Sequence, residues 1–205
     1  MEIYQSIILI LKNKGRFRML RVWLTTGLVI LHTFLHAIPN KVLLMRHAEK
    51  PLEGICLNLK GLERAAALVP YFQGRSEIQQ YGTPVVIFAL KPGPENGSVR
   101  SIQTVAPLAH AMGIQLNTDF EDPQYPKMIE WIKTHPGFQD KTVLICWEHH
   151  VLPDMAKQFG ASTVPATWEG DVFDRVWVLD LSQEEVIFTD IPQRLLFGDS
   201  SAGAS

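Results

Sequence analysis

The chain has 205 residues, of which 46% are hydrophobic and 20% charged, and its formal net charge is −2. This composition is typical of a globular protein with a sizeable core and excludes a disordered chain, and the length fits one domain with a short appendage. The near-neutral charge, without a basic stripe in the globular part, argues against a nucleic-acid partner.

The first 38 residues differ from the rest of the chain. Five basic residues between positions 12 and 21 precede the uncharged, mainly apolar run Val22–Ala37. This order is typical of a signal peptide or a membrane anchor, so we expect residues 1–38 to direct export or membrane anchorage. Three alternatives stay open. The segment could be a buried amphipathic helix, or a start at Met19 could give a conventional short signal peptide, with residues 1–18 as a start-site artefact. If the whole N-terminal segment is such an artefact, the protein is cytoplasmic.

The globular part alternates strand-like and helix-like patterns. Buried strands are predicted at 41–46, 85–90 and 142–147, and helices at 61–72, 99–112, 125–134 and 153–159. Two alternating runs, 172–180 and 185–189, predict a final antiparallel pair of strands. The alternation predicts an α/β three-layer sandwich with a mostly parallel central sheet and helices on both faces.

Arginine or histidine follows each of the three buried strands. Arg46 and His47 end the first, Arg100 follows the second and its loop, and His149 follows the third. In open α/β sheets ligands bind at the carboxyl ends of the strands. Arginine suits phosphate, and histidine can be a nucleophile near neutral pH. The sequence therefore predicts a dianion pocket that contains a nucleophile.

Four ordered motifs between about residues 40 and 198 resemble one family. Leu43–Glu49 is similar to an Arg-His-Gly-Glu signature, with Ala48 in place of the glycine, and Leu57–Ala65 to a Leu-Thr-x-x-Gly-x-x-Gln-Ala helix start. Ser98–Thr104 resembles the second arginine motif, and the strand before His149 the second histidine motif. The chain thus resembles the histidine phosphatase superfamily, which is phosphoglycerate-mutase-like, and within it short branch 1.

The resemblance implies a phosphoglycerate-mutase-like fold for residues 39–198 and a role for each motif residue. His47 would accept the phosphoryl group, Arg46 and Arg100 would bind its oxygens, and His149 would donate a further hydrogen bond. No metal or other cofactor is implied. The expected enzyme is a metal-independent phosphomonoesterase of the histidine acid phosphatase type.

The general acid has a weaker signal. In the short branch it is a carboxylate after the helix of the second arginine motif, here within residues 117–122. Among these we expect Glu121 to be the catalytic acid. Glu148, which adjoins His149, is the competing candidate.

A metal site is not expected from the sequence. Cys146, Glu148, His149 and His150 match no closed zinc spacing, and successive residues of a strand point to opposite faces. The chain has only two cysteines, which makes a disulfide framework unexpected.

The sequence therefore predicts hydrolysis of a phosphomonoester through a phosphohistidine intermediate at His47. Within the family the alternatives are a protein phosphohistidine phosphatase and a mutase-like phosphotransferase. An alternative of another class is a membrane-tethered, phosphate-binding pseudoenzyme. The expected partner is a small phosphorylated substrate or a phosphoprotein, with a membrane contact through the N-terminal segment. Residues 199–205 are expected to form a flexible tail.

Overall fold

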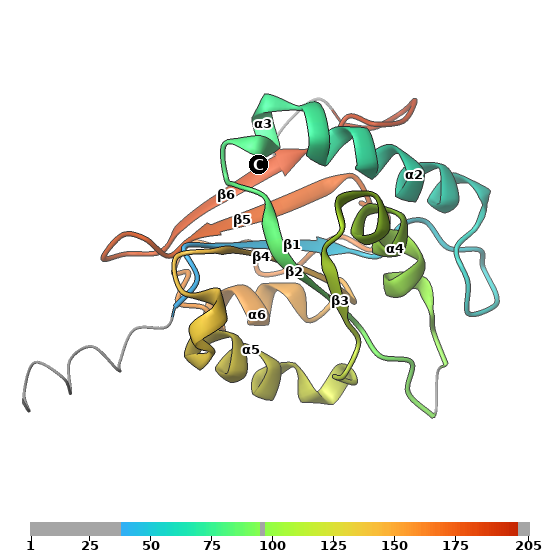
Figure 1. The fold of residues 1–205 in the computed structure, drawn as a ribbon. Coiled ribbons are helices and arrows are strands. Elements are labelled where there is room, and N and C mark those ends of the chain that lie inside the picture. The colour runs from blue at the N-terminus through green and yellow to red at the C-terminus, as the bar shows by residue number, and fades with distance from the viewer. Residues whose placement is uncertain (1–37, 95–96, 201–205) are drawn as a thin grey trace, which may run out of the picture. The chain divides into compact units, whose positions relative to one another are not determined.

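The computed structural model describes residues 38–94 and 97–200 (Figure 1). The predicted signal or anchor segment, up to residue 37, lies outside the described residues, as do positions 201–205 of the predicted tail. Among the described residues no helix is long and apolar enough to span a membrane.

A six-stranded sheet forms the centre of the described chain, in the order β3-β2-β4-β1-β5-β6. The strands are β1 (Lys41–Arg46), β2 (Pro84–Ala89), β3 (Gln115–Asn117), β4 (Thr142–Trp147), β5 (Arg175–Asp180) and β6 (Ile187–Pro192). β3, β2, β4 and β1 run parallel, whereas β5 is antiparallel to both β1 and β6. The mostly parallel sheet and the final antiparallel pair confirm the prediction. β3 was not predicted, because its three residues are exposed or half-buried and form no apolar run.

Helices cover both faces of the sheet, which confirms the three-layer sandwich (Figure 1). The helices are α2 (Leu59–Gly74), α3 (Ser76–Gln79), α4 (Arg100–Met112), α5 (Tyr125–Thr134) and α6 (Leu152–Gln158). α2 and α4 pack over one face, and α5 and α6 over the other (Figure 1).

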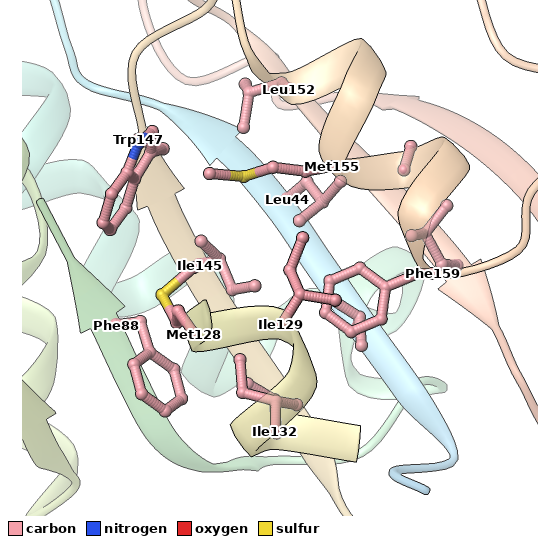
Figure 2. Close-up of a cluster of buried hydrophobic side chains, with 14 of the residues drawn as sticks. Leu44, Phe88, Met128, Ile129, Ile132, Ile145, Trp147, Leu152, Met155 and Phe159 are labelled. Carbon is pink, nitrogen blue, oxygen red and sulfur yellow. The ribbon is translucent and has the colours of Figure 1, made fainter. Parts of the chain in front are cut away.

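Alternate residues of each strand belong to opposite halves of the core. Leu44 and Ile145 pack with the residues of α5 and α6, and Figure 2 shows them near Met155 of α6 and near Met128 and Ile129 of α5. Their chain neighbours Leu43 and Leu144 belong to the second cluster, which contains α2 and α4 residues. Burial on both faces holds the strand ends, where the predicted site lies, on a rigid support.

The register between β1 and β4 decides which residues meet at the edge of the sheet. Arg46 is paired with Trp147, and the backbone N–H of His47 donates to the carbonyl of Trp147 at 3.2 Å. His47 and Glu148 each follow one residue later. The parallel pairing therefore brings Glu148 beside His47, although the two are far apart in sequence.

The start of α2 packs directly on the backbone that follows His47. The Asn58 side chain caps the helix by accepting from the Gly61 N–H at 2.9 Å. A Cβ at position 61 would overlap the carbonyl oxygen of Glu49. Gly61 is therefore required by this close approach.

Candidate active site

Arg46 is held by one edge of its guanidinium group. Its Nη1 donates to the carbonyls of Glu169, Gly170 and Val172 at 3.2, 2.9 and 3.1 Å. The ring of Phe173 lies against the guanidinium carbon, which is 3.8 Å from the ring centroid. Nε is buried and has no hydrogen-bond partner among the described residues. The side chain is thus fixed in place while its Nε remains able to donate to a ligand.

Burial lowers the pKa of Arg46 to about 10, although the carboxylates of Glu148 and Glu49 oppose the effect. The guanidinium therefore still carries its charge at neutral pH. Its burial makes an oxyanion a favourable partner, because the surrounding protein screens that charge less than water would.

His47 presents one ring nitrogen to the site. Its side chain is 1% exposed, and its Nδ1 lies 2.7 Å from the carbonyl oxygen of Ala48. A carbonyl only accepts, so in the neutral ring Nδ1 carries the proton and Nε2 carries the lone pair. Nε2 is buried without a hydrogen-bond partner in the described chain. Nε2 is thus the atom suited to attack phosphorus.

Arg100 approaches from the start of α4. Its Nη2 donates to the carbonyl of Gly54, and its buried Nε has no described hydrogen-bond partner. The Thr104 hydroxyl donates to the carbonyl of Arg100 at 2.8 Å and accepts from the Ala48 N–H at 2.8 Å. Thr104 therefore ties the start of α4 to the residue that follows His47.

His149 lies beside Arg46, with its Nδ1 3.4 Å from Nη2 of that arginine. Burial, followed by the positive charge of Arg46, lowers the pKa of His149 to about 4, so the ring is neutral near pH 7. An arginine only donates, so Nδ1 is the acceptor and Nε2 carries the ring proton. A donor Nε2 agrees with the hydrogen bond that the resemblance implies for His149, and that role stays a prediction.

Glu148 is the carboxylate that the structure brings to His47. Its Oε2 lies 3.4 Å from Nε2 of His47, an ion-pair distance rather than a well-formed hydrogen bond. Burial raises the pKa of Glu148, but the contact and charge of His47, and then the charge of Arg100, outweigh burial and lower it. His47, Glu148 and Arg100 therefore interact electrostatically at this edge.

Glu121 occupies a different place. Its carboxylate lies 3.2 Å from Nζ of Lys91, and its backbone N–H donates to the Gln124 side chain at 2.9 Å. The Lys91 N–H donates to the carbonyl of Phe120, so this loop lies at the end of β2. Because β2 is two strands from β1, Glu121 lies on the order of 10 Å away from the end of β1. The described contacts join Glu121 to none of the other predicted site residues, and its role as the acid stays a prediction.

The sequence did not predict that residues 169–173 form a loop that contacts Arg46. The second-to-last strand was predicted to start at Val172, but β5 starts at Arg175. The stretch before it instead supplies the carbonyls and the ring that hold Arg46. Its sequence gives no signal of this contact, which joins residues more than 120 positions apart.

The fold is similar to that of known proteins, although the sequence is not. No protein-family model matches the chain, and no curated protein is similar to it in sequence. The protein histidine phosphatase SixA, solved in complex with tungstate, is similar with a TM-score of 0.51 and 13% identity, over 75% of this chain and 97% of that one. Phosphoglycerate mutase from Plasmodium falciparum is similar with a TM-score of 0.50 and 15% identity, over 80% of this chain and 98% of that one.

These likenesses, at low sequence identity, concern the fold. The described part of the chain has a phosphoglycerate-mutase-like α/β fold, as the sequence motifs predicted.

Proposed function

We propose that the protein is a histidine-phosphatase-type phosphatase that hydrolyses phosphoesters through a phosphohistidine at His47. The observation that carries this proposal is a set of three buried nitrogens without hydrogen-bond partners in the described residues. They are Nε of Arg46, Nε of Arg100 and Nε2 of His47. Buried polar groups are rarely left unpaired, because each unpaired group costs about 1–3 kcal/mol. A bound phosphoryl group would supply oxygens to both arginines and phosphorus to the histidine.

The first half of the reaction moves the phosphoryl group to the protein. Nε2 of His47 attacks phosphorus, the bond from phosphorus to the leaving oxygen breaks, and that oxygen takes a proton. Arg46 and Arg100 bind the non-bridging oxygens, where preorganised positive charge stabilises the transition state. The Nδ1–H bond to the Ala48 carbonyl holds the ring in the orientation that attack requires.

Glu148 is the acid that this geometry favours. Its Oε2 lies 3.4 Å from Nε2 of His47, so the carboxyl group lies beside the nitrogen that attacks phosphorus. In its protonated form Glu148 can protonate the leaving oxygen while Nε2 of His47 attacks. In the second half, Glu148 as carboxylate takes a proton from the water that attacks the phosphohistidine, and phosphate and free His47 are released.

Glu148 and Glu121 can be distinguished as candidate acids by how the loss of activity in each variant depends on the leaving group. An acid matters most when the leaving oxygen is basic, so Glu148→Gln should lower kcat on an alkyl phosphate by roughly 10²- to 10⁴-fold, and much less on p-nitrophenyl phosphate. Glu121→Gln is the matched control and should change neither rate by more than a few-fold. The reverse pattern would transfer the acid role to Glu121.

This proposal names a class of substrates, the phosphoesters, and not one natural substrate. The tungstate-bound structural neighbour is a protein histidine phosphatase, and the other is a phosphoglycerate mutase. The scheme needs no metal, since two arginines supply the positive charge. We expect turnover of p-nitrophenyl phosphate by the whole chain to persist in EDTA, and loss of turnover in EDTA would contradict the scheme.

A further inference from the structure

The turn after β4 gathers three side chains that can ligate a metal. Glu148, His149 and His150 each offer a ligand atom, and these atoms lie within 4.8 Å of one another. The sequence argument against a metal assumed that neighbouring residues point to opposite faces of a strand. β4 ends at Trp147, and His149 and His150 lie in a turn, so that argument fails here.

A fourth candidate ligand, the carboxylate of Asp122, lies beside this cluster. Oδ2 of Asp122 is 3.7 Å from Nε2 of His150. Oδ1 of the same carboxylate accepts from the Trp147 indole at 2.8 Å, which holds Asp122 next to the turn. Asp122 is thus fixed by the residue that ends β4, while His150, 59% exposed, has room to turn toward an ion.

The donor set fits zinc better than a harder cation. Two imidazoles and one carboxylate are the ligands of open zinc sites, which keep a fourth position for water or another ligand. Magnesium and calcium prefer oxygen ligands alone. Glu148 and Asp122 bring two negative charges, which offset the repulsion between a dication and Arg46.

We propose that Glu148, His149 and His150, with Asp122 beside them, form a zinc-binding site that blocks the phosphate site when it is filled. A carboxylate bound to zinc holds no proton, so Glu148 could no longer protonate a leaving oxygen. The ion would also engage His149, which lies against Arg46. Zinc is therefore an inhibitor here, and a chelator should raise the activity of a preparation that contains zinc. The inhibition rests on the proposed function, but the binding does not.

The test uses the whole chain, freed of metal with EDTA and then of EDTA by gel filtration. Zinc chloride is titrated in against a chromophoric zinc indicator, and the hydrolysis of p-nitrophenyl phosphate is followed in parallel. We expect one zinc ion per chain and inhibition over the same range of zinc concentration. His150→Ala should weaken binding by roughly 10- to 100-fold or more and relieve the inhibition, while metal-free turnover is retained. His110→Ala, at an exposed histidine in the last turn of α4, is the matched control and should behave as wild type.

Each outcome is decisive for the metal site. Wild type that binds no zinc, or His150→Ala that binds it as tightly as wild type, would overturn the site. Zinc that binds through His150 without inhibiting an active chain would overturn the blocking role. A chain that binds zinc through His150 but has no turnover, with or without zinc, would keep the metal site and count against the phosphatase function.

Discussion

Arg46 and Arg64 are both buried, but they differ in how many of their guanidinium N–H groups have hydrogen-bond partners. Arg64 contacts both oxygens of Glu49 at 2.7 and 2.9 Å, both oxygens of Asp199 at 2.7 and 2.9 Å, and the Gln193 amide at 3.2 Å. These bonds use all five of its N–H groups. Arg46 is equally buried but keeps an unpartnered Nε within the described chain. A saturated arginine indicates a structural role, whereas one with a free donor indicates a place for a ligand.

Arg64 with Glu49, Asp199 and Gln193 is called the saturated site below, and its pKa values reflect this complete pairing. Burial lowers the pKa of Arg64, but its bonds to Asp199 and Glu49 outweigh burial and raise it. Burial raises the pKa of Asp199, but the guanidinium of Arg64 and two backbone N–H groups hold it at about 2. The group joins the segment after His47, helix α2 and the C-terminal stretch, including the first residue of the predicted tail. The saturated site should therefore control stability, and the unsaturated one activity.

Arg64→Met tests this contrast with the largest expected effect on stability. Removal of Arg64 takes the hydrogen-bonded guanidinium away from two buried carboxylates and leaves only the half-exposed Lys60 near Glu49, which should cost about 3–5 kcal/mol. Thermal unfolding should then occur on the order of 10 °C lower. Lys60→Met is the control, because Lys60 lies 3.7 Å from the same Glu49 but is half-exposed, and its loss should cost less than about 1 kcal/mol. Equal effects of the two substitutions would refute the contrast.

Gly61→Ala should have the next largest effect. The added Cβ overlaps the carbonyl of Glu49, so α2 must move away from the segment that carries His47. We expect a loss of about 1–3 kcal/mol or more in unfolding free energy. Gly74→Ala changes the same helix in the same way, but no atom lies within 4 Å of its added Cβ, so it should be neutral or slightly stabilising. Chemical denaturation of both variants gives the comparison, and a neutral Gly61→Ala would show that the close approach is dispensable.

Acid should weaken the interaction between Arg64 and Asp199. The pKa of Asp199 is depressed in the folded state, from 3.8 to about 2. Its stabilising contribution is therefore complete above the unfolded value and is lost as the pH falls through the folded value. The melting temperature of wild type should drop across the interval from about pH 4 to pH 2. Asp199→Asn should melt lower at pH 7 and show a shallower drop, and an unchanged slope would contradict this assignment.

The smallest effect is expected at Tyr71, a buried residue whose hydroxyl has no hydrogen-bond partner among the described residues. Burial raises the pKa of this phenol to about 12. Because no bond is lost, Tyr71→Phe should change stability by less than about 0.5 kcal/mol or improve it slightly. Tyr125→Phe, which removes a 2.6 Å bond to Asp154, is the comparison and should cost about 0.5–1.5 kcal/mol. A larger loss at Tyr71 than at Tyr125 would show that the buried hydroxyl has a partner.

The strands and the main helices were predictable because their signals are local. The apolar runs of β1 and β4 are buried along almost their whole length, and α5 has the bounds that its periodicity predicted. α2 begins at Leu59, two residues before the predicted start, because Asn58 supplies the cap. Arg46 and His47 could be placed at the edge of the sheet, since a strand of that length must end there.

Contacts between distant segments could not be predicted in the same way. The contact of His47 with Glu148 depends on the register of β1 against β4, and that of Arg64 with Asp199 spans 135 positions. No periodicity encodes either pairing. The preference for Glu121 followed family order, whereas the structure brings Glu148 to His47. The side chains of residues 148–150 converge because β4 ends at Trp147, as predicted, so the opposite-face rule for strands does not apply to them.

His47 can be identified as the nucleophile by trapping the phosphorylated residue. Whole chain, with EDTA present, is mixed with a radiolabelled phosphoester, quenched within milliseconds in alkali, which preserves phosphohistidine, and mapped by peptide sequencing. We expect label on His47, and neither label nor turnover in His47→Ala. Arg64→Met, where it still folds, should retain the label. Label on another residue, or turnover that survives in His47→Ala, would contradict the role of His47 as the nucleophile.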